Sequence, residues 1–365
     1  MEKNPFKFGS IVDEPYYTDR KEELKKVLSV LNSENHLVLI SPRRYGKTSL
    51  IDKATRLSER PVINIDLQLI TSVTDLATQI LRRVYRLHPF EKVRQFVRHF
   101  RVIPTVSVNP VTNAVDVSFV PDGLHSPVLE DVLNLVESLS NNKNKTIVVF
   151  DEFQEAKQID AGLLKFLRAI MQHHKKINYV FLGSQESLIR DIFEKKKSPF
   201  YHFGQLMTLE KIPYDDFFLY LQHGLNLPGK KKQDIANEIL SITDCHPYYT
   251  QMLAFVVWNN LLRSVKPEKA VIDAILEILQ MNDIHYERLW NNLNKTDKKL
   301  LFGLVVLTES PLSEAFYRKS NLAAPSTVFS SLKRLMTNGI LIKSGSVYEI
   351  DDPFFKRWLQ NKLKA

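Results

Sequence analysis

The sequence predicts an α/β protein whose parallel sheet lies between two layers of helices, followed by a helical subdomain and a C-terminal winged helix-turn-helix. Three observations support this prediction. Short apolar stretches alternate with amphipathic helical patterns up to about residue 211, which is typical of a parallel sheet with right-handed crossovers. Strand patterns then stop until residue 340. Near the C-terminus, three helical patterns precede two short strands joined by a tight turn.

The composition is that of a soluble globular protein, with 44% hydrophobic and 25% charged residues. The longest apolar run, residues 300–307, is far too short to cross a bilayer, and the first residues lack an apolar signal core. The single cysteine, Cys245, cannot form an intramolecular disulfide, which suits a reducing compartment. We therefore expect a cytoplasmic protein with no membrane partner. The net charge of +9 permits an acidic partner such as nucleic acid, although charge spread evenly would only aid solubility.

The first predicted strand and helices surround a loop that suits phosphate binding. A helix is predicted over residues 21–31, with Asp19 as its N-cap, and a buried strand over residues 37–40. The loop that follows ends in Gly46-Lys47-Thr48 and opens a helix. In this context backbone N–H groups and the helix dipole favour an anion, Lys47 reaches the β- and γ-phosphates, and the Thr48 hydroxyl ligates Mg²⁺.

One position of this loop departs from the usual pattern, because Ser41 stands where a glycine is expected. The alternative is a chance Gly-Lys-Thr in a surface loop, and the flanking strand and helix favour the phosphate loop over it. The residues predicted to bind nucleotide are then Ser41, Pro42, Arg43, Arg44, Tyr45, Gly46, Lys47, Thr48 and Ser49.

The remaining core elements follow in order. Further strands are predicted at residues 61–66, 146–150, 179–182 and 205–209, and helices at residues 74–87, 128–140, 161–174 and up to 194. Residues 88–127 are predicted to be an insertion, with a basic helix and a hairpin that turns at residues 109–113. Residues 82–101 hold seven Lys and Arg against one Glu, which suits either a solvated helix face or contacts to a phosphate backbone.

Two acidic residues follow the apolar strand at residues 146–150. At the tip of a strand beside the phosphate-loop strand, Asp151 is predicted to hold Mg²⁺ and Glu152 to act as the general base that polarises the attacking water. Such a pair can also be a simple helix N-cap, but its position after a phosphate loop favours catalysis. A water-activating glutamate indicates hydrolysis rather than transfer to an acceptor. Ser184 is predicted to contact the γ-phosphate or the water, or else to be a turn residue, and the two alternatives stay open.

The C-terminal third is predicted to contain a helical lid at residues 212–290 and a winged helix at residues 291–365. The winged helix carries twelve Lys and Arg against six Asp and Glu, a net charge of +6. Its third predicted helix buries an apolar stripe and faces outward with Ser326, Thr327, Ser330, Lys333 and Arg334. Hydroxyls and cations on such a helix suit DNA, but winged helices also dock proteins, and both alternatives stay open.

Several motifs together resemble one known family. The most specific is Phe150-Asp151-Glu152-Phe153-Gln154-Glu155, and the others are Tyr17-Thr18-Asp19-Arg20-Lys21-Glu22-Glu23-Leu24, Pro42-Arg43-Arg44-Tyr45-Gly46-Lys47-Thr48-Ser49, Val106 to Asn113, Leu182-Gly183-Ser184, His246-Pro247-Tyr248-Tyr249-Thr250-Gln251 and Tyr348 to Trp358. Through these the chain resembles, nearly end to end, the archaeal-type predicted ATPases, a branch of the P-loop superfamily related to the STAND and AAA+ ATPases.

The resemblance implies a three-layer P-loop ATPase core at residues 1–211 and a set of functional residues. Arg20 and Pro247 are expected near the nucleotide base and ribose, although Arg20 could instead form a surface salt bridge with Glu23. His202 stands near the place of the family's usual arginine finger, so we expect slow hydrolysis unless Arg43, Arg44 or Arg190 substitutes. No set of Cys and His residues has metal-ligand spacing, so Mg²⁺ is the only metal expected.

These observations predict an ATP-binding protein, an ATPase with Mg²⁺ as cofactor, whose nucleotide state controls the winged helix. The expected partners are ATP and, for the winged helix, DNA. The alternative to DNA is a protein partner or self-association. The alternative is a nucleotide switch without turnover whose winged helix docks a protein.

Overall fold

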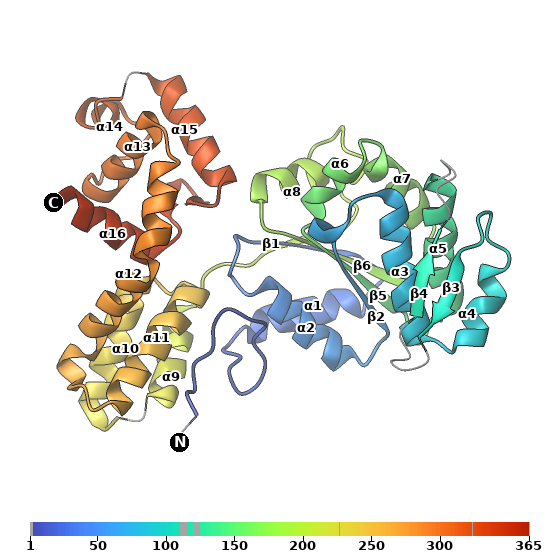
Figure 1. Ribbon diagram of the computed structural model, residues 1–365, viewed down its shortest axis with the longest axis horizontal. Coiled ribbons are helices and arrows are strands. Elements are labelled where there is room, and N and C mark those ends of the chain that lie inside the picture. Colours follow the sequence, from blue (N-terminus) through green and yellow to red (C-terminus); the bar gives the residue numbers. More distant parts are fainter. Residues whose placement is uncertain (1–2, 110–114, 120–124, 226, 323, 365) are drawn as a thin grey trace. The chain divides into compact units, whose positions relative to one another are not determined.

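The computed structural model describes residues 3–109, 115–119, 125–225, 227–322 and 324–364. Its contacts divide the chain into two compact units. The α/β unit comprises residues 20–41 and 47–210, and the helical unit comprises residues 1–19, 42–46 and 211–365. We describe each unit by itself, with the elements labelled as in Figure 1.

The α/β unit is built on a parallel sheet, which its described residues form in the strand order β2-β5-β6-β1-β7. The strands are β1 (Leu37–Ile40), β2 (Val62–Asp66), β5 (Thr146–Asp151), β6 (Ile177–Gly183) and β7 (Gln205–Thr208). The helices are α1 (Lys21–Leu31), α2 (Lys47–Ser58), α3 (Val73–Leu87), α4 (Phe90–Val97), α5 (His125–Leu139), α6 (Ala156–Ile159), α7 (Leu163–Met171) and α8 (Glu186–Phe193), with short 3₁₀ turns at Leu67–Leu69 and Phe153–Glu155.

Helices cover the two faces of this sheet, as Figure 1 shows. Strands β1 and β6 are buried at every residue, as expected for a parallel sheet covered on both sides. Alternate residues of β1 pack into different hydrophobic clusters on the two faces of the sheet. Val38 and Ile40 belong to the cluster with α3, α5 and α7, and Leu37 and Leu39 belong to the cluster with α1 and α2. The predicted three-layer α/β core is therefore confirmed.

The strand order corrects one expectation. Asp151 was predicted at the tip of a strand beside the phosphate-loop strand, but β6 lies between β1 and β5. The register pairs Ile40 with Gly183 and Phe150 with Phe181, so the three strands end close together. The carboxyl end of β6, which leads into Ser184, is thus inserted between the loop after β1 and the acidic pair after β5.

The start of α1 also differs from expectation. The N-cap is Arg20 in a left-handed conformation (φ 65°), and no side chain caps the helix, so the predicted capping role of Asp19 is wrong. Asp19 is itself left-handed (φ 45°), whereas an N-cap residue normally has extended backbone.

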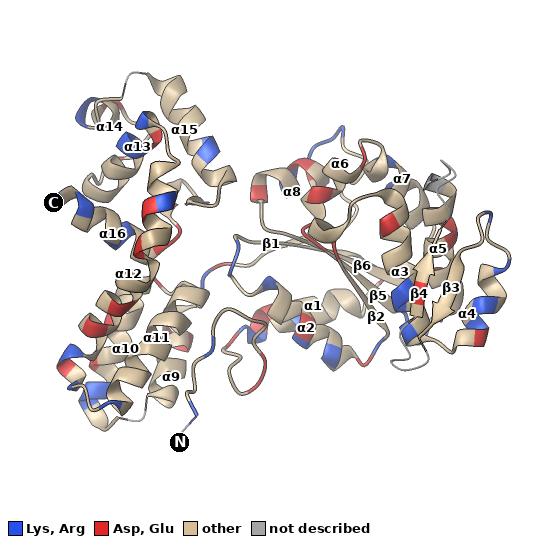
Figure 2. Ribbon diagram, in the orientation of Figure 1, with Lys and Arg blue, Asp and Glu red and all other residues tan. Residues whose placement is uncertain are grey.

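The insertion contains α4 and a separate antiparallel hairpin of β3 (Thr105–Val108) and β4 (Val115–Ser118), with Val108 opposite Val115. The predicted turn at residues 109–113 lies mostly outside the described residues. Three of the basic residues of segment 82–101 are paired with acids: Arg82 with Asp116, Arg94 with Glu91, and Arg101 with both Glu130 and Asp131. Figure 2 marks the basic positions along the ribbon in blue and the acidic positions in red. These ion pairs neutralise part of the positive charge of segment 82–101. For its other basic residues, a solvated helix face and contacts to a phosphate backbone both stay open.

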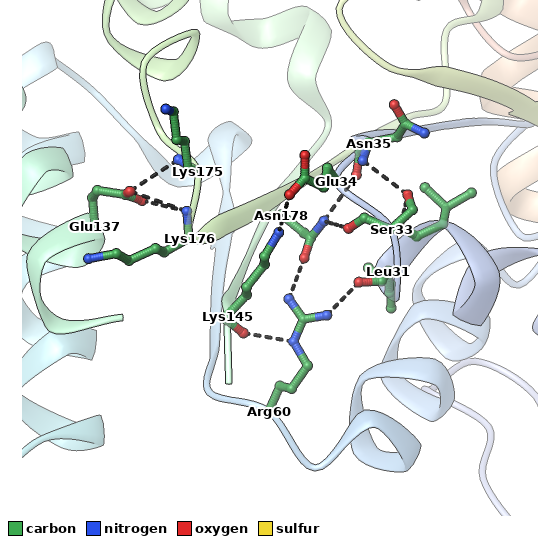
Figure 3. Close-up of polar contacts among 11 residues, drawn as sticks. Leu31, Ser33, Glu34, Asn35, Arg60, Glu137, Lys145, Lys175, Lys176 and Asn178 are labelled. Carbon is green, nitrogen blue, oxygen red and sulfur yellow. Dashed lines mark hydrogen bonds and ion pairs between the residues drawn. The ribbon is translucent and has the colours of Figure 1, made fainter. Parts of the chain in front are cut away.

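A polar network ties together the amino-terminal ends of the strands (Figure 3). Arg60, in the loop before β2, donates to the carbonyls of Lys145 (2.7 Å) and Leu31 (2.5 Å) and to the side chain of Asn178. Asn178, 1% exposed at the start of β6, donates in turn to the carbonyls of Ser33 and Asn35, both at 3.0 Å. This network satisfies carbonyl groups of two segments, the stretch from the end of α1 to β1 and the loop before β5, at the edge opposite Asp151 and Ser184.

The helical unit contains α9 (Tyr214–Gly224), α10 (Gly229–Thr243), α11 (Pro247–Leu262) and α12 (Pro267–Asn291). Its C-terminal part contains α13 (Lys295–Val306), α14 (Glu314–Lys319), α15 (Pro325–Thr337), the hairpin β8 (Leu341–Ser344) and β9 (Val347–Ile350), and α16 (Pro353–Lys364). The predicted helices and wing are present, whereas α16 was not predicted. One hydrophobic core runs through all of these elements. No described helix of either unit is long and apolar enough to cross a membrane.

The outward face of α15 differs at one residue from the prediction. Arg334 was expected to be free for an external partner, but its guanidinium donates to the buried carboxylate of Asp297 on α13 (2.8 and 2.6 Å). The Ser331 hydroxyl donates to the same carboxylate, which is 2% exposed. Arg334 therefore anchors α15 to α13, because a buried carboxylate requires partners. Ser326, Ser330 and Lys333 are exposed as predicted.

Candidate active site

The backbone of the phosphate loop explains its departure from the usual sequence. Gly46 has a φ of +90° and therefore needs the freedom of glycine, and Arg44 is left-handed with a φ of 67°. Ser41 is not among the residues with a left-handed backbone, so its Cβ causes no strain. Ser41 is fully buried, and its N–H donates to the carbonyl of Gly183 at the end of β6 (3.3 Å). Serine is thus tolerated at the first position.

Lys47 begins α2 and is 6% exposed. Its ammonium group donates to the backbone carbonyl of Ser41 (2.9 Å), which keeps the charge at the loop rather than in solvent. An ammonium group has three donors. Lys47 can therefore hold the loop and still contact a bound phosphate.

Asp151 and Thr48 meet at the carboxyl edge of the sheet, although β6 separates the two strands, β5 and β1, that lead to them. The Thr48 hydroxyl donates to Asp151 Oδ2 (3.2 Å), and Asp151 Oδ1 accepts the Glu152 N–H (2.9 Å). Burial raises the pKa of the Asp151 carboxyl and Glu152 adds to this, opposed by the Glu152 N–H, Lys47 and Thr48. A hydroxyl and a carboxylate are ligands that Mg²⁺ accepts, so the pair predicted to hold the metal is brought together.

The raised pKa of Asp151 leads to a stability prediction. A carboxyl group whose pKa is higher in the folded chain destabilises the fold once pH rises through its folded and unfolded pKa values. Asp151→Asn removes the charge at constant size and is expected to raise the melting temperature at pH 7 by a few degrees. The gain should disappear below the ordinary Asp pKa of 3.8, and Mg²⁺ should stabilise only the wild type. A lower melting temperature for the variant at pH 7 would contradict this account.

The Glu152 carboxylate is held by hydrogen-bond donors of two residues, Gln154 and Ser184. Its backbone is left-handed (φ 50°). Its carboxylate oxygen Oε2 accepts the Ser184 hydroxyl (2.6 Å), the Ser184 N–H (3.3 Å) and the Gln154 amide (2.5 Å). Ser184 is thus brought to the acidic pair, although its contact to a phosphate stays a prediction. The sequence reasoning missed Gln154, whose only signal was its place in the Asp-Glu-Phe-Gln motif.

Loop residues 42–46 make their contacts within the helical unit. The Arg44 guanidinium donates to the Tyr249 hydroxyl (2.8 Å) and lies over the Tyr248 ring, 4.7 Å from its centroid. Tyr45 is 4% exposed, with its ring 4.8 Å from that of His246. His246 caps α11 by accepting from two N–H groups, and Pro247 is the first residue of that helix. The predicted roles of Pro42, Arg43, Ser49 and Pro247 at a nucleotide stay predictions.

The charged residues predicted to lie near the nucleotide base or to take the place of an arginine finger differ in their contacts. Arg20 is 4% exposed and donates to Glu23 (2.7 Å) and to the carbonyl of Glu210 (2.5 Å), so its ion pair is buried rather than superficial. Arg190 pairs with Glu186 and Glu194 on its own helix. Arg43 is exposed and forms no ion pair within the described ranges. His202 is exposed, with a φ of 53°.

Two segments of the chain match known protein families. Residues 17–253 match the family described as an ATPase domain predominantly from Archaea, and residues 284–361 match a probable winged helix domain. No curated protein matches the chain. Among solved structures, the Walker-type ATPase PABY2304 of Pyrococcus abyssi superimposes with a TM-score of 0.68 at 18% identity, over 98% of this chain and 99% of that chain.

A second solved structure shares the fold. The ORC2 protein of Aeropyrum pernix, solved in ADPNP and ADP complexes, gives a TM-score of 0.53 at 14% identity, over 99% of this chain and 100% of that chain. At such identities the likeness establishes the fold, a Walker-type ATPase fold that ends in a winged helix. The family match covers well over half of the chain and includes the phosphate loop and the acidic pair. The chain therefore belongs to the family of ATPase domains found predominantly in Archaea.

Proposed function

We propose that this protein binds Mg-ATP at loop 41–49 and hydrolyses it slowly to ADP and phosphate. The observation that carries the proposal is the convergence of Lys47, Thr48, Asp151 and Glu152 at one edge of the sheet. The loop N–H groups and the Lys47 ammonium bind the triphosphate. Thr48 and Asp151 hold Mg²⁺, which neutralises phosphate charge when bound.

In this proposal Glu152 is the general base. It orients the attacking water and accepts its proton, and Ser184 keeps the carboxylate in place through the hydroxyl contact of 2.6 Å. We expect turnover to be slow because His202 stands near the place of the family's usual arginine finger and Arg190 is engaged on its own helix. The ORC2 neighbour was solved with nucleotides, which supports nucleotide as the ligand of this shared fold.

The test is phosphate release by the purified protein with ATP, with and without excess chelator. We expect metal-dependent turnover in the wild type. Lys47→Ala should weaken ATP binding strongly, because the charge at the loop is lost. If Lys47→Ala binds ATP as tightly as the wild type, the assigned site is wrong.

We further propose that the nucleotide state controls the winged helix, and a chain of contacts within the helical unit supports this. Tyr249 accepts from Arg44 of the loop, and its hydroxyl also interacts electrostatically with the carboxylate of Asp352. Asp352 accepts from the Tyr286 hydroxyl (3.0 Å) and from the N–H groups that begin α16, at Phe354 and Phe355. A phosphate that draws Arg44 away from Tyr249 would therefore change the support of α16.

This coupling predicts a selective effect of Tyr249→Phe, which removes only the hydroxyl that accepts from Arg44 and interacts with the charge of Asp352. ATP should still bind, but the nucleotide-induced change in amide exchange of segment 351–364 should be largely lost. Tyr248→Phe is the matched control, because it keeps the ring under the Arg44 guanidinium. If nucleotide changes the amide exchange of segment 351–364 equally in the wild type and in both variants, coupling through the Tyr249 hydroxyl is excluded.

For the partner of the winged helix we propose DNA. The support is the net charge of +6 over residues 291–365 and the exposed Ser326, Ser330 and Lys333 on α15. Binding to duplex DNA should then be much stronger at about 50 mM than at about 200 mM salt. If the affinity for DNA does not change with salt concentration, contacts to the phosphate backbone are ruled out.

The second candidate is a nucleotide switch without turnover whose winged helix docks a protein or a second copy of the chain. One observation favours it: Phe329, midway along α15, is 59% exposed. Phe329→Ala should abolish a protein contact, whereas binding governed by phosphate charges should respond chiefly to Lys333→Ala. Turnover of the wild type separates the proposed ATPase from the switch without turnover.

A further inference from the structure

Gln154 is a buried amide directly beside the candidate general base. It lies in the 3₁₀ turn that follows β5 and is 2% exposed. Its Nε2 donates to Glu152 Oε2 at 2.5 Å. Its other polar atom, Oε1, is buried and has no hydrogen-bond partner among the described residues. Burying an amide with half of its capacity unused is costly, so its contact to Glu152 needs an explanation beyond stability.

The contacts of Glu152 are asymmetric. The Gln154 amide, the Ser184 hydroxyl and the Ser184 N–H all reach Oε2, and none of them reaches Oε1. A carboxylate held through one oxygen keeps the other oxygen in a defined direction. This is the arrangement that a general base needs, because the oxygen that takes the proton must face the water.

The surroundings prevent Gln154 from turning away. The preceding Phe153 is fully buried among aromatic rings, with centroids 4.6 Å from Phe181 and 5.7 Å from Phe193. On the other side lies Gly183, where a Cβ atom would be 3.0 Å from Gln154 Oε1 and 2.1 Å from the Ile189 side chain. The amide is therefore confined between a rigid turn and the backbone of β6. An amide with its oxygen toward Glu152 would repel the carboxylate, so the nitrogen must face it.

We infer that Gln154 is a positioning residue for the general base Glu152: it holds Oε2 so that Oε1 is directed at the attacking water. The inference rests on the proposed ATP hydrolysis. It assigns a chemical reason to the glutamine of the Asp-Glu-Phe-Gln motif. The glutamine does not touch the nucleotide, so its loss should change the rate of the chemical step and leave binding unaltered.

The test uses the full-length protein with Gln154→Ala, Gln154→Asn and Gln154→Glu. We expect kcat to fall about 10-fold to 100-fold in the first two, a share of the roughly 10²–10⁴-fold that general-base catalysis contributes. KM and the affinity for a non-hydrolysable ATP analogue should stay unchanged. In Gln154→Glu, a second carboxyl group beside Glu152 should move the acid limb of the kcat–pH profile to higher pH.

Asn178→Ala is the matched control, because Asn178 is an equally buried amide at the other end of β6. It should lower the melting temperature without changing kcat per folded molecule. If the wild type hydrolyses ATP and the Gln154 variants keep its kcat and pH profile, the inference is overturned and the ATPase stands. If kcat and analogue affinity fall together with the melting temperature, Gln154 is only structural and the inference is also overturned. If the wild type shows no turnover, the proposed function itself fails, and the positioning role fails with it.

Discussion

Glu152→Gln is expected to lower the rate of ATP hydrolysis by about 10²–10⁴-fold while ATP still binds. Glutamine keeps the size of the side chain and can still accept from Ser184, but it cannot take a proton from water. Among the described residues, the hydrogen bonds of the Glu152 carboxylate are to Gln154 and Ser184, not to the loop that is proposed to bind the triphosphate. The effect should therefore appear in kcat and in single-turnover rates, not in the affinity for ATP.

Glu155→Gln is the control for this experiment. Glu155 lies in the same 3₁₀ turn, and the same change of charge there should leave turnover close to that of the wild type. If Glu152→Gln hydrolyses ATP as fast as the wild type, Glu152 is not the base. If neither the wild type nor the variant hydrolyses ATP, the protein is better explained as a nucleotide switch.

Arg60→Ala is expected to lower the free energy of unfolding of the α/β unit by about 3–5 kcal/mol, since it removes three charge-assisted hydrogen bonds and leaves their acceptors unpaired. The three acceptors belong to Leu31 at the end of α1, Lys145 in the loop before β5 and Asn178 at the start of β6, all at the amino edge of the sheet (Figure 3). Burial also lowers the pKa of Arg60, in keeping with a guanidinium that is half-buried. The measurement is denaturant unfolding followed by a probe in the α/β unit.

Arg56→Ala gives the comparison for Arg60. Arg56 forms an exposed pair with Asp52 on α2, with its side chain 63% exposed, and such pairs contribute about 0–1 kcal/mol. If Arg60→Ala lowers the free energy of unfolding by less than about 1 kcal/mol, as expected for Arg56→Ala, water replaces the arginine in the network. Because the network lies at the edge opposite Asp151, we expect ATP affinity per folded molecule to stay unchanged.

Much of the candidate site follows from local sequence. The strand at residues 37–40, the loop to Thr48 and the helix after it can be predicted because a buried strand, a glycine with positive φ and a helix start each leave a short-range pattern. The same holds for Asp151 and Glu152, which directly follow an apolar strand. The wing was predicted correctly because two strands around Ser344 and Gly345 form a local hairpin.

The tertiary structure alone decided which of these residues meet. The insertion of β6 between β1 and β5, which brings Ser184 to Glu152, depends on how long crossovers pack, and no short segment encodes that order. The same is true of the anchoring of Arg334 by Asp297, 37 residues away, and of Arg44 by Tyr249, 205 residues away. The sequence by itself determined the chemical groups and their local backbone. Tertiary packing determined which distant residues became partners. A buried charge requires a complementary group, and that group is the one that the fold places within hydrogen-bond distance.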